Sequence, residues 1–366
     1  MAGALFIGLM SGTSLDGVDV ALVEFQSTHQ PNVLQTHFLA YPPELRTQIL
    51  ALQHPTENEL ETTALMANTL ARLYADAVNQ LLTIATLSPN EISAIGCHGQ
   101  TIRHRPELGF TLQIGNPSLL AEITGIAVVA DFRSRDIAAG GQGAPLVPAF
   151  HQAIFAHPQL NRAVINIGGI ANITYLASNS DLIGFDSGPG NMLLDAWIKQ
   201  HKNLNYDANG AWASTGKLIA PLLSAMLAEP YLALTPPKST GRDLFNDAWL
   251  SEHLANSHYA PEDVAFTLVS LTAHTIHQAL LRHCRSVDEV YLCGGGAHNA
   301  LLMQQLQSLL GDIKIETTNQ LGIGVDWVEA IAFAWLAELC LSQQTASLPE
   351  VTGAKGPRIL GAIYQH

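Results

Sequence analysis

The stretch Ser11-Gly12-Thr13-Ser14-Leu15-Asp16-Gly17 consists almost wholly of small and polar residues between two apolar runs, 5–10 and 18–25. The runs are rich in β-branched and aromatic residues, which predicts two strands joined by a tight turn. Such a turn points several backbone N–H groups into one concavity, which can bind phosphate oxygens without basic side chains. The alternative is an ordinary hairpin with Asx and Ser turns.

A second stretch, Gly184-Phe185-Asp186-Ser187-Gly188-Pro189-Gly190-Asn191, places an aspartate at the end of a predicted strand and before a predicted helix. The loop amides and the helix N-terminus could receive phosphate while Asp186 takes a proton as a general base. The alternative is that Asp186 or Ser187 only caps the helix. Two turns of this kind in one chain favour the functional interpretation of both.

A third glycine-rich turn, Gly294-Gly295-Gly296, follows a strand and precedes a helix, so the backbone there could approach adenine or ribose. Other polar residues end predicted strands, where open α/β sheets usually bind ligands, namely His98 and Gln100, then Asp131 and Arg133. Each has a structural alternative, and for His98 the default is a hydrogen-bonded polar side chain. Glu329 begins an apolar helix, where a carboxylate usually complements the helix dipole.

Composition limits the function classes. The chain has 366 residues, of which 48% are hydrophobic and 13% charged, with a formal net charge of −14. These values exclude a disordered chain and argue against a nucleic-acid partner. Four cysteines without C-x-x-C spacing indicate buried thiols in a reducing compartment. The N-terminus makes a poor signal peptide and the last apolar segment, 330–341, is too short to span a membrane, so we expect a cytoplasmic protein.

The order of predicted elements indicates a duplicated architecture. Helical spacing of apolar residues predicts a long helix over 58–87, and strands follow at 92–97 and 126–130. The glycine-rich segment 139–145 reads as a hinge, and beyond it the opening pattern of strand, polar turn and strand returns at 163–177. We therefore expect two related α/β domains. No Walker A motif occurs, and no G-x-G-x-x-G follows the first strand.

Taken together, these segments resemble the anhydro-N-acetylmuramic acid kinases of bacteria. The resemblance covers nearly the whole chain and rests on eight stretches in the family's order: SGTSLDGVD, HGQT, ADFR, GGQGAPLVP, INIGGIANIT, GFDSGPGN, CGGGAHN and VEAIAFAWLA. It implies two RNase H-like domains of the sugar kinase, Hsp70 and actin type, facing a central nucleotide cleft. We expect an N-terminal domain of residues 1–135 plus about 345–366, and a C-terminal domain of 136–344.

The resemblance also implies an activity: ATP-dependent opening and phosphorylation of 1,6-anhydro-N-acetylmuramic acid, giving N-acetylmuramic acid 6-phosphate and ADP in cell-wall recycling by a homodimer. Asp186 would be the catalytic base, and Gly294, Gly295 and Gly296 would bind adenosine. The ATP phosphates would lie against Gly12, Thr13, Ser14, Leu15, Asp16, Gly17, Val18, Asp19, Gly168 and Gly188. The sugar would contact His98, Gln100, Asp131, Arg133 and Glu329.

Magnesium is expected to accompany ATP, with Asp16 or Asp19 as candidate ligands because hard cations prefer oxygen. Two alternatives remain open on the sequence. One is a kinase for another amino sugar. The other is a nucleotide-gated binding module like actin or Hsp70, which would hydrolyse ATP slowly and independently of any sugar.

Overall fold

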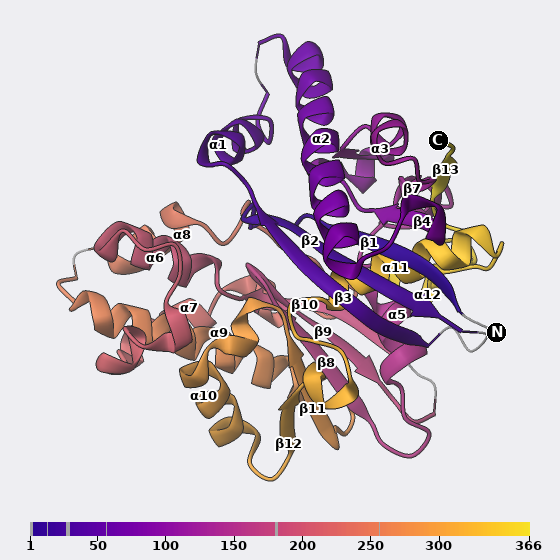
Figure 1. Ribbon diagram of the computed structural model, residues 1–366. Helices are drawn as coiled ribbons and strands as arrows, with labels where there is room; N and C mark the ends of the chain where they lie inside the picture. Colours follow the sequence, from indigo (N-terminus) through magenta and orange to yellow (C-terminus); the bar gives the residue numbers. More distant parts are fainter. Residues whose placement is uncertain (1–2, 13, 27–29, 56, 180–181, 256) are drawn as a thin grey trace. The chain divides into compact units, whose positions relative to one another are not determined.

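Two mixed β-sheets organise the chain, each within its own unit of the computed structural model (Figure 1). The first unit comprises residues 1–150 and 327–366, and the second comprises residues 151–326. The structure describes residues 3–12, 14–26, 30–55, 57–179, 182–255 and 257–366.

The first unit contains β1 (Ala4–Met10), β2 (Gly17–Phe25), β3 (Pro31–Ala40), α1 (Pro43–Ala51), α2 (Glu59–Ala85), β4 (Ile92–Cys97), β5 (Gln100–Arg105), β6 (Phe110–Ile114), α3 (Pro117–Thr124), β7 (Val128–Ala130), α4 (Ser134–Ala138), α11 (Val328–Leu341), α12 (Pro349–Thr352) and β13 (Ala362–Tyr364). Helix α5 (Val147–Phe155) carries the chain into the second unit. The second unit contains β8 (Arg162–Ile167), β9 (Ile170–Leu176), β10 (Leu182–Pro189), α6 (Met192–Lys202), α7 (Ala220–Leu227), α8 (Asp247–Leu254), α9 (Pro261–His283), β11 (Glu289–Cys293), α10 (Ala300–Leu310) and β12 (Lys314–Thr317).

The two sheets share the topology of the 5-stranded sheet, to which the first unit adds the edge strand β13. The strand order is β13-β7-β4-β1-β2-β3 in the first unit and β10-β9-β8-β11-β12 in the second. In each, three consecutive strands form an antiparallel meander, and the first strand of the meander pairs in parallel with a later strand, β4 on β1 and β11 on β8. This repetition confirms the expected pair of related α/β domains of the RNase H-like type.

Helix α11 belongs to the first unit, where its yellow ribbon runs beside the indigo strands from the other end of the chain (Figure 1). A methyl group added to Gly8 would lie 1.8 Å from the carbonyl oxygen of Ala330, and one added to Gly96 would lie 2.0 Å from that of Phe333. Only glycine allows this approach of helix to strands. The division at 326/327 therefore differs from the boundary expected at 344/345, because α11 packs on β1 and β4.

The glycine-rich segment 139–145 is not a hinge between the units. It lies inside the first unit, and its backbone is bonded to the C-terminal part of the chain, with Gln142 N donating to Thr352 O at 2.7 Å. The amide of Lys355 donates to Ala139 O at 2.9 Å. These bonds explain why the first division falls at 150/151 instead of the expected 135/136.

Helix α9 is the core helix of the second unit. Among the described residues it is the one helix whose length and composition would suffice to cross a membrane. Within its most apolar stretch of 18 residues, 72% is buried inside the protein. It packs against α6, α7, α10 and β10. Its apolar character is therefore accounted for by the interior of this unit. The four cysteine thiols are also buried and free, as the sequence predicted.

Replacing Gly96 by alanine is expected to destabilise the first unit by about 1–3 kcal/mol or more, the range typical of overpacked cores. The added methyl group meets backbone, which cannot turn away as a side chain can. The urea midpoint of unfolding measures the effect. Gly356→Ala is the control, because its methyl group would meet only the end of the Arg358 side chain, at 3.3 Å. Equal midpoints for the two variants would contradict this packing argument.

Candidate functional site

In each unit, parallel strands bring polar residues to one edge of the sheet. Strands β1, β4 and β7 are parallel, so Ser11, His98 and Asp131, which directly follow them, lie at the same edge. In the second unit β8, β10 and β11 run in one direction, because β8 and β10 are both antiparallel to β9. The three glycine-containing turns after these strands therefore share one edge as well.

The turn between β1 and β2 is held by a buried network of side chains. Ser11 Oγ donates to Gln100 Oε1 and is bonded to the hydroxyl of Tyr41, which lies 3.3 Å from the hydroxyl of Tyr74. Gln100 Nε2 returns to the turn by donating to Gly12 O at 3.3 Å. Since Ser11 has a single proton, Tyr41 must donate to it. Burial raises the pKa of Tyr41 to about 12, so this phenol stays neutral.

The backbone of this turn is strained at one residue. Leu15 has a φ of 59°, an unusual value for a residue other than glycine, and its side chain is buried. Burial of the leucine offsets the strain, which is a common condition of ligand-binding turns. Gly12 and Asp19 are half-buried, Ser14 and Asp16 are exposed, and Gly17 and Val18 are buried. Thr13, expected to bind phosphate, lies outside the described residues.

Arg133 and His98 form a direct pair. Arg133 Nη2 lies 2.9 Å and Nε 3.3 Å from His98 Nε2, and Arg133 Nη1 donates to Gly143 O at 2.8 Å. Because an arginine only donates, His98 Nε2 is an acceptor and the ring proton sits on Nδ1. Burial, with the Arg133 charge, lowers the pKa of His98 to about 3. His98 is therefore a neutral hydrogen-bonding group.

The carboxylate of Glu329, at the start of α11, contributes to the electrostatics of Arg133. Burial lowers the pKa of Arg133 to about 10, while the charges of Glu329 and Asp136 raise it. The guanidinium therefore remains charged at neutral pH. Gln100, His98, Arg133 and Glu329 all belong to the first unit. Glu329 was expected in the other domain, and the packing of α11 explains the difference.

In the second unit, the turn after β8 is bonded to the loop after β10. The amide of Gly190 donates to Gly169 O at 2.9 Å, and the amide of Asn191 donates to Gly168 O at 2.8 Å. Asn191 Nδ2 also donates to Ile167 O at 3.1 Å. Gly168 is half-buried and Gly188 is buried. The two turns thus form one rigid backbone layer.

The glycines after β11 join the same layer. Gly294 has a φ of 76°, and a methyl group there would lie 2.3 Å from Asn166 Oδ1 in β8. A methyl group on Gly296 would lie 2.3 Å from Ile167 Cγ2, whereas Gly295 is exposed, with its nearest such contact, Asn191 Nδ2, at 3.8 Å. Gly295 is therefore the most open of the three positions.

Asp186 lies on β10 beside a β-bulge, where Asp186 and Gly188 face consecutive residues of β9. Its Oδ2 accepts the amide of Thr240 at 3.0 Å, its own amide donates to Lys238 O at 3.2 Å, and Tyr231 donates to its carbonyl at 2.9 Å. Burial raises the pKa of Asp186 to about 6, although the Thr240 hydrogen bond and the Lys238 charge lower it. Such a carboxylate is ionised at neutral pH and suited to accept a proton.

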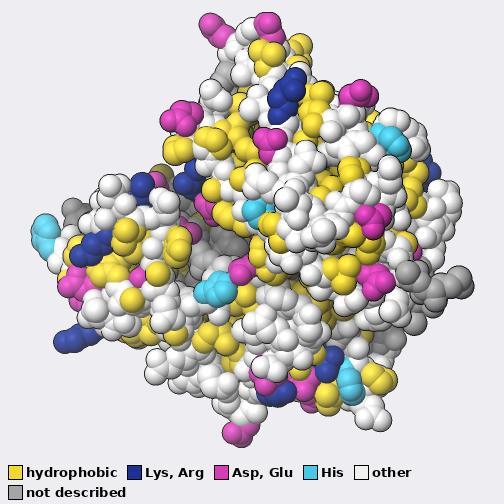
Figure 2. Space-filling view, viewed as in Figure 1, with side chains coloured by type: hydrophobic (Ala, Val, Ile, Leu, Met, Phe, Trp, Pro, Cys, Tyr) yellow, Lys and Arg dark blue, Asp and Glu magenta, His cyan; other side chains and the backbone are white. Residues whose placement is uncertain are grey.

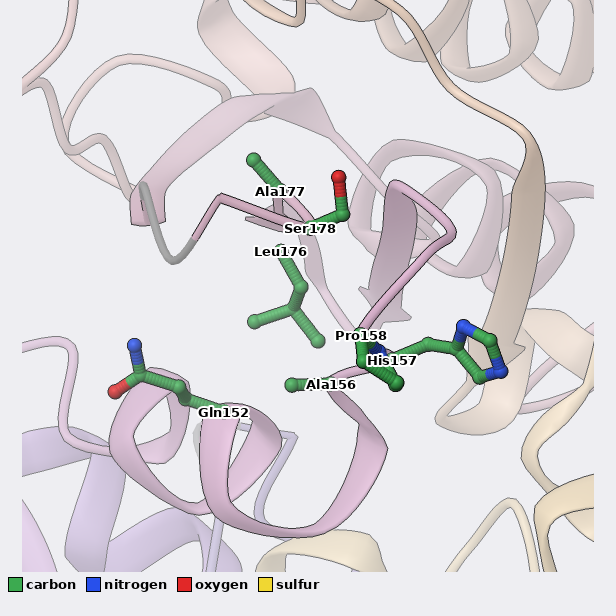
Figure 3. A pocket seen from close by; sticks show the side chains of 7 residues that line it. All are labelled: Gln152, Ala156, His157, Pro158, Leu176, Ala177 and Ser178. Atoms are coloured by element: carbon green, nitrogen blue, oxygen red, sulfur yellow. The ribbon is translucent and has the colours of Figure 1, made fainter.

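A pocket of about 270 Å³ elsewhere in the second unit contains none of the predicted site residues (Figure 3). It is lined by Gln152, Ala156, His157, Pro158, Leu176, Ala177 and Ser178. Leu176 pairs with Arg162, the first residue of β8, so this pocket lies at the sheet edge opposite the glycine turns. Its lining has no carboxylate and no basic side chain apart from histidine, which makes it unsuited to phosphoryl transfer.

The face drawn in Figure 2 shows no competing basic site among the described residues. On the face drawn in Figure 2, Lys and Arg side chains are scattered and do not merge into one broad basic patch. Among the described residues, no group of three His, Cys, Asp or Glu side chains could hold a metal ion. Phosphate binding at the glycine turns would therefore depend on backbone N–H groups.

The family model for anhydro-N-acetylmuramic acid kinase matches residues 4–366. The chain belongs to this family. An anhydro-N-acetylmuramic acid kinase of Thiobacillus denitrificans is 54% identical over 361 residues, covering 98% of this chain and 96% of its own. Relatives of the same name from Nitrosospira multiformis and Pseudomonas fluorescens are each 51% identical and cover 99% or more of both chains. Membership makes this chain an enzyme of the kinase type, transferring a phosphoryl group to an alcohol.

The sequence did not identify several residues that position the expected ones. Tyr41 and Tyr74 hold Ser11, and Thr240 and Lys238 hold Asp186. The segment PPKSTGRD at 236–243 does carry a signal, because its prolines, small residues and charges resemble the other functional turns. Its pairing with Asp186 depends on a tertiary contact 54 residues away in sequence.

Replacing Asp186 by asparagine is expected to stabilise the protein at pH 7.5 and to have little effect at pH 3.5, below the unfolded-state pKa of 3.8. Because burial raises the folded-state pKa from 3.8 to about 6, the folded state binds more protons than the unfolded state between these values. Stability therefore falls as pH rises through this window, and the neutral amide avoids the loss.

Thermal melting at the two pH values measures this effect. The exposed Asp312→Asn substitution serves as the control and should show no such pH-dependent difference. An Asp186→Asn variant less stable than the unmodified chain at pH 7.5 would refute the argument.

Proposed function

We propose that this chain is the kinase that opens the 1,6-anhydro ring of 1,6-anhydro-N-acetylmuramic acid and phosphorylates O6, giving N-acetylmuramic acid 6-phosphate and ADP. Family membership supports the reaction class and the sugar. The observation that carries the proposal is the half-buried carboxylate of Asp186, whose pKa is raised to about 6. It lies at the sheet edge where the glycine turns of the second unit gather.

Asp186 acts as the general base in this proposal. It removes a proton from a water molecule while the water oxygen forms a bond to the anomeric carbon. The bond from that carbon to O6 breaks, and O6 attacks the γ-phosphorus of ATP. The bond from phosphorus to the bridging oxygen then breaks, and ADP leaves. The Thr240 amide bonds Oδ2 and so orients the carboxylate, which fixes the position of Oδ1, the proton-accepting oxygen.

The glycine turns supply the charge stabilisation that phosphoryl transfer requires. We assign the ATP phosphates to the turn at 12–19 and to Gly168 and Gly188, and the adenosine to 294–296. The strained, anchored turn between β1 and β2 and the hydrogen-bonded layer of the second unit support this assignment, because preorganised amides need no rearrangement on binding. The central nucleotide cleft expected from the sequence stays a prediction.

The sugar pocket is assigned to His98, Gln100, Asp131, Arg133 and Glu329. Neutral His98, charged Arg133 and the carboxylate of Glu329 offer the mixture of donors and acceptors that a sugar with hydroxyl, amide and carboxylate groups needs. Asp131 is exposed at the end of β7 with a φ of 57°, a strained position typical of ligand-binding residues.

Magnesium would be held by Asp19 or Asp16 with the phosphates of ATP. The donor set fits, because Mg²⁺ in such sites usually takes one or two carboxylates, substrate phosphates and water. The ion would neutralise charge on the phosphates when bound. We further propose a cytoplasmic homodimer that serves cell-wall recycling, as the family resemblance implies.

Replacing Asp186 by asparagine is expected to lower turnover by about 10²–10⁴-fold, the usual contribution of a general base. ADP release is measured with the anhydro sugar, with other amino sugars and without sugar. The unmodified chain should release ADP only with the anhydro sugar, and Asp312→Asn should behave like it. Sugar-independent hydrolysis would favour a nucleotide-gated module. Faster ADP release with another amino sugar would mean that this other sugar is the substrate.

Replacing Lys238 by methionine is expected to move the acidic limb of kcat/KM to higher pH. Activity should fall below about pH 6 as Asp186 gains a proton, and removing the Lys238 charge removes an influence that lowers this pKa. Tyr231, whose pKa is raised by burial, also interacts with this carboxylate, and Arg282 lies close to Lys238, with which it shares the Leu232 carbonyl.

The pH profiles of Lys238→Met and Lys238→Arg are compared, with exposed Lys217→Met as the control. Arginine should keep the limb near its original position, since it keeps the charge. If the acidic limb of kcat/KM stays at the same pH in Lys238→Met, this electrostatic role is excluded.

A further inference from the structure

Asp136 is a buried carboxylate that the proposed reaction does not use. It lies in α4, and its side chain is 0% exposed. Its Oδ1 accepts the hydroxyl of Thr352 at 2.8 Å, and its Oδ2 accepts the amide of Gly143 at 2.8 Å. A buried carboxylate costs free energy unless donors compensate it, and here each oxygen has one.

Gly143, whose amide donates to Asp136, also accepts a hydrogen bond from Arg133. Gly143 O accepts Arg133 Nη1 at 2.8 Å, and the other side-chain hydrogen bonds of the guanidinium within the described part of the chain go to His98 Nε2. The hydrogen bonds that reach Arg133 therefore run from Asp136 Oδ2 through Gly143, whereas the Thr352 hydroxyl bonds the other oxygen, Oδ1.

The loop is also pressed closely against α4. A methyl group on Gly141 would lie 2.2 Å from Asp136 Oδ2, and one on Gly143 would lie 2.8 Å from Ile137 Cγ1. The loop backbone thus has little room to move relative to Asp136. This explains the glycine-rich composition of 140–143, which the sequence had suggested was a hinge.

We propose that Asp136 is a positioning residue that, through the Gly143 carbonyl, fixes the guanidinium of Arg133 for binding the sugar. The inference rests on the proposed sugar role of Arg133. Without the bond to Asp136, the Gly143 amide has no partner and the loop shifts. Arg133 Nη1 then loses the Gly143 carbonyl that fixes its position. The geometry makes the role specific to the Gly143 bond, because the Thr352 bond leads away from Arg133.

The chain offers a matched pair of substitutions that separates positioning from stability. Asp136→Ala removes both hydrogen bonds, whereas Thr352→Val removes only the one that does not lead to Arg133. Asp136→Asn keeps an oxygen for Gly143 and can donate its amide to the Thr352 hydroxyl, which can turn its own proton to Leu348 O, 3.3 Å away. Asparagine should therefore rescue what alanine loses.

Steady-state kinetics with the anhydro sugar and ATP provide the test. Asp136→Ala should raise KM for the sugar about tenfold, the factor for one lost hydrogen bond to a charged group. Its KM for ATP should change less than about twofold, within the scatter of distant substitutions. Thr352→Val and Asp136→Asn should both keep the sugar KM close to that of the unmodified chain. Equal increases in Asp136→Ala and Thr352→Val would mean a structural role only and would overturn the proposal.

Gly141→Ala keeps the carboxylate but forces it away from the loop, so it carries the test if Asp136→Ala does not fold. It should raise the sugar KM in the same way. Arg133→Gln is measured beside them: if it leaves the sugar KM unchanged, the proposed role of Arg133 fails. If Arg133→Gln raises the sugar KM while Asp136→Ala and Gly141→Ala do not, only the positioning role of Asp136 is wrong.

Discussion

Parallel pairing of the first strand of each meander with a later strand is the constraint on which the candidate site depends. Parallel neighbours end at the same edge of a sheet, so residues far apart in sequence are delivered together. In the first unit this places Ser11, His98 and Asp131 at one edge, and in the second it gathers three glycine turns. An antiparallel β4 would carry His98 to the opposite edge. The direction of the strands therefore determines which residues lie together in the candidate site.

That constraint explains how an acidic chain can be suited to an anionic substrate. With a formal charge of −14, the protein cannot rely on net attraction, and its glycine turns hold few basic side chains. Backbone amides at strand ends provide local positive potential whatever the total charge. Such amides are useful only if they stay in place, and the bonds between Gly168, Gly190 and Asn191 fix those of the second unit.

Local patterns predicted the individual elements well. The long helix expected at 58–87 is α2, Glu59–Ala85, and the strand expected at 92–97 matches β4. The glycine turns were also found, because their composition is itself the local signal. The domain boundaries were not, since they depend on where α11 and the 139–145 loop pack. The largely apolar sequence of α11 indicates that the helix is buried, but it does not indicate which sheet the helix packs on.

The contrast between two carboxylates shows what sequence cannot supply. Asp136 and Asp186 each stand near small residues and next to functional stretches, and each was available as a base by residue type. Asp136 has a donor on both oxygens and no exposed surface, so it is committed to holding the loop. Among the described residues, Asp186 receives one hydrogen bond on its side chain, from Thr240, which leaves Oδ1 able to accept a proton. Donor count distinguishes a structural carboxylate from a reactive one, and only tertiary contacts determine that count.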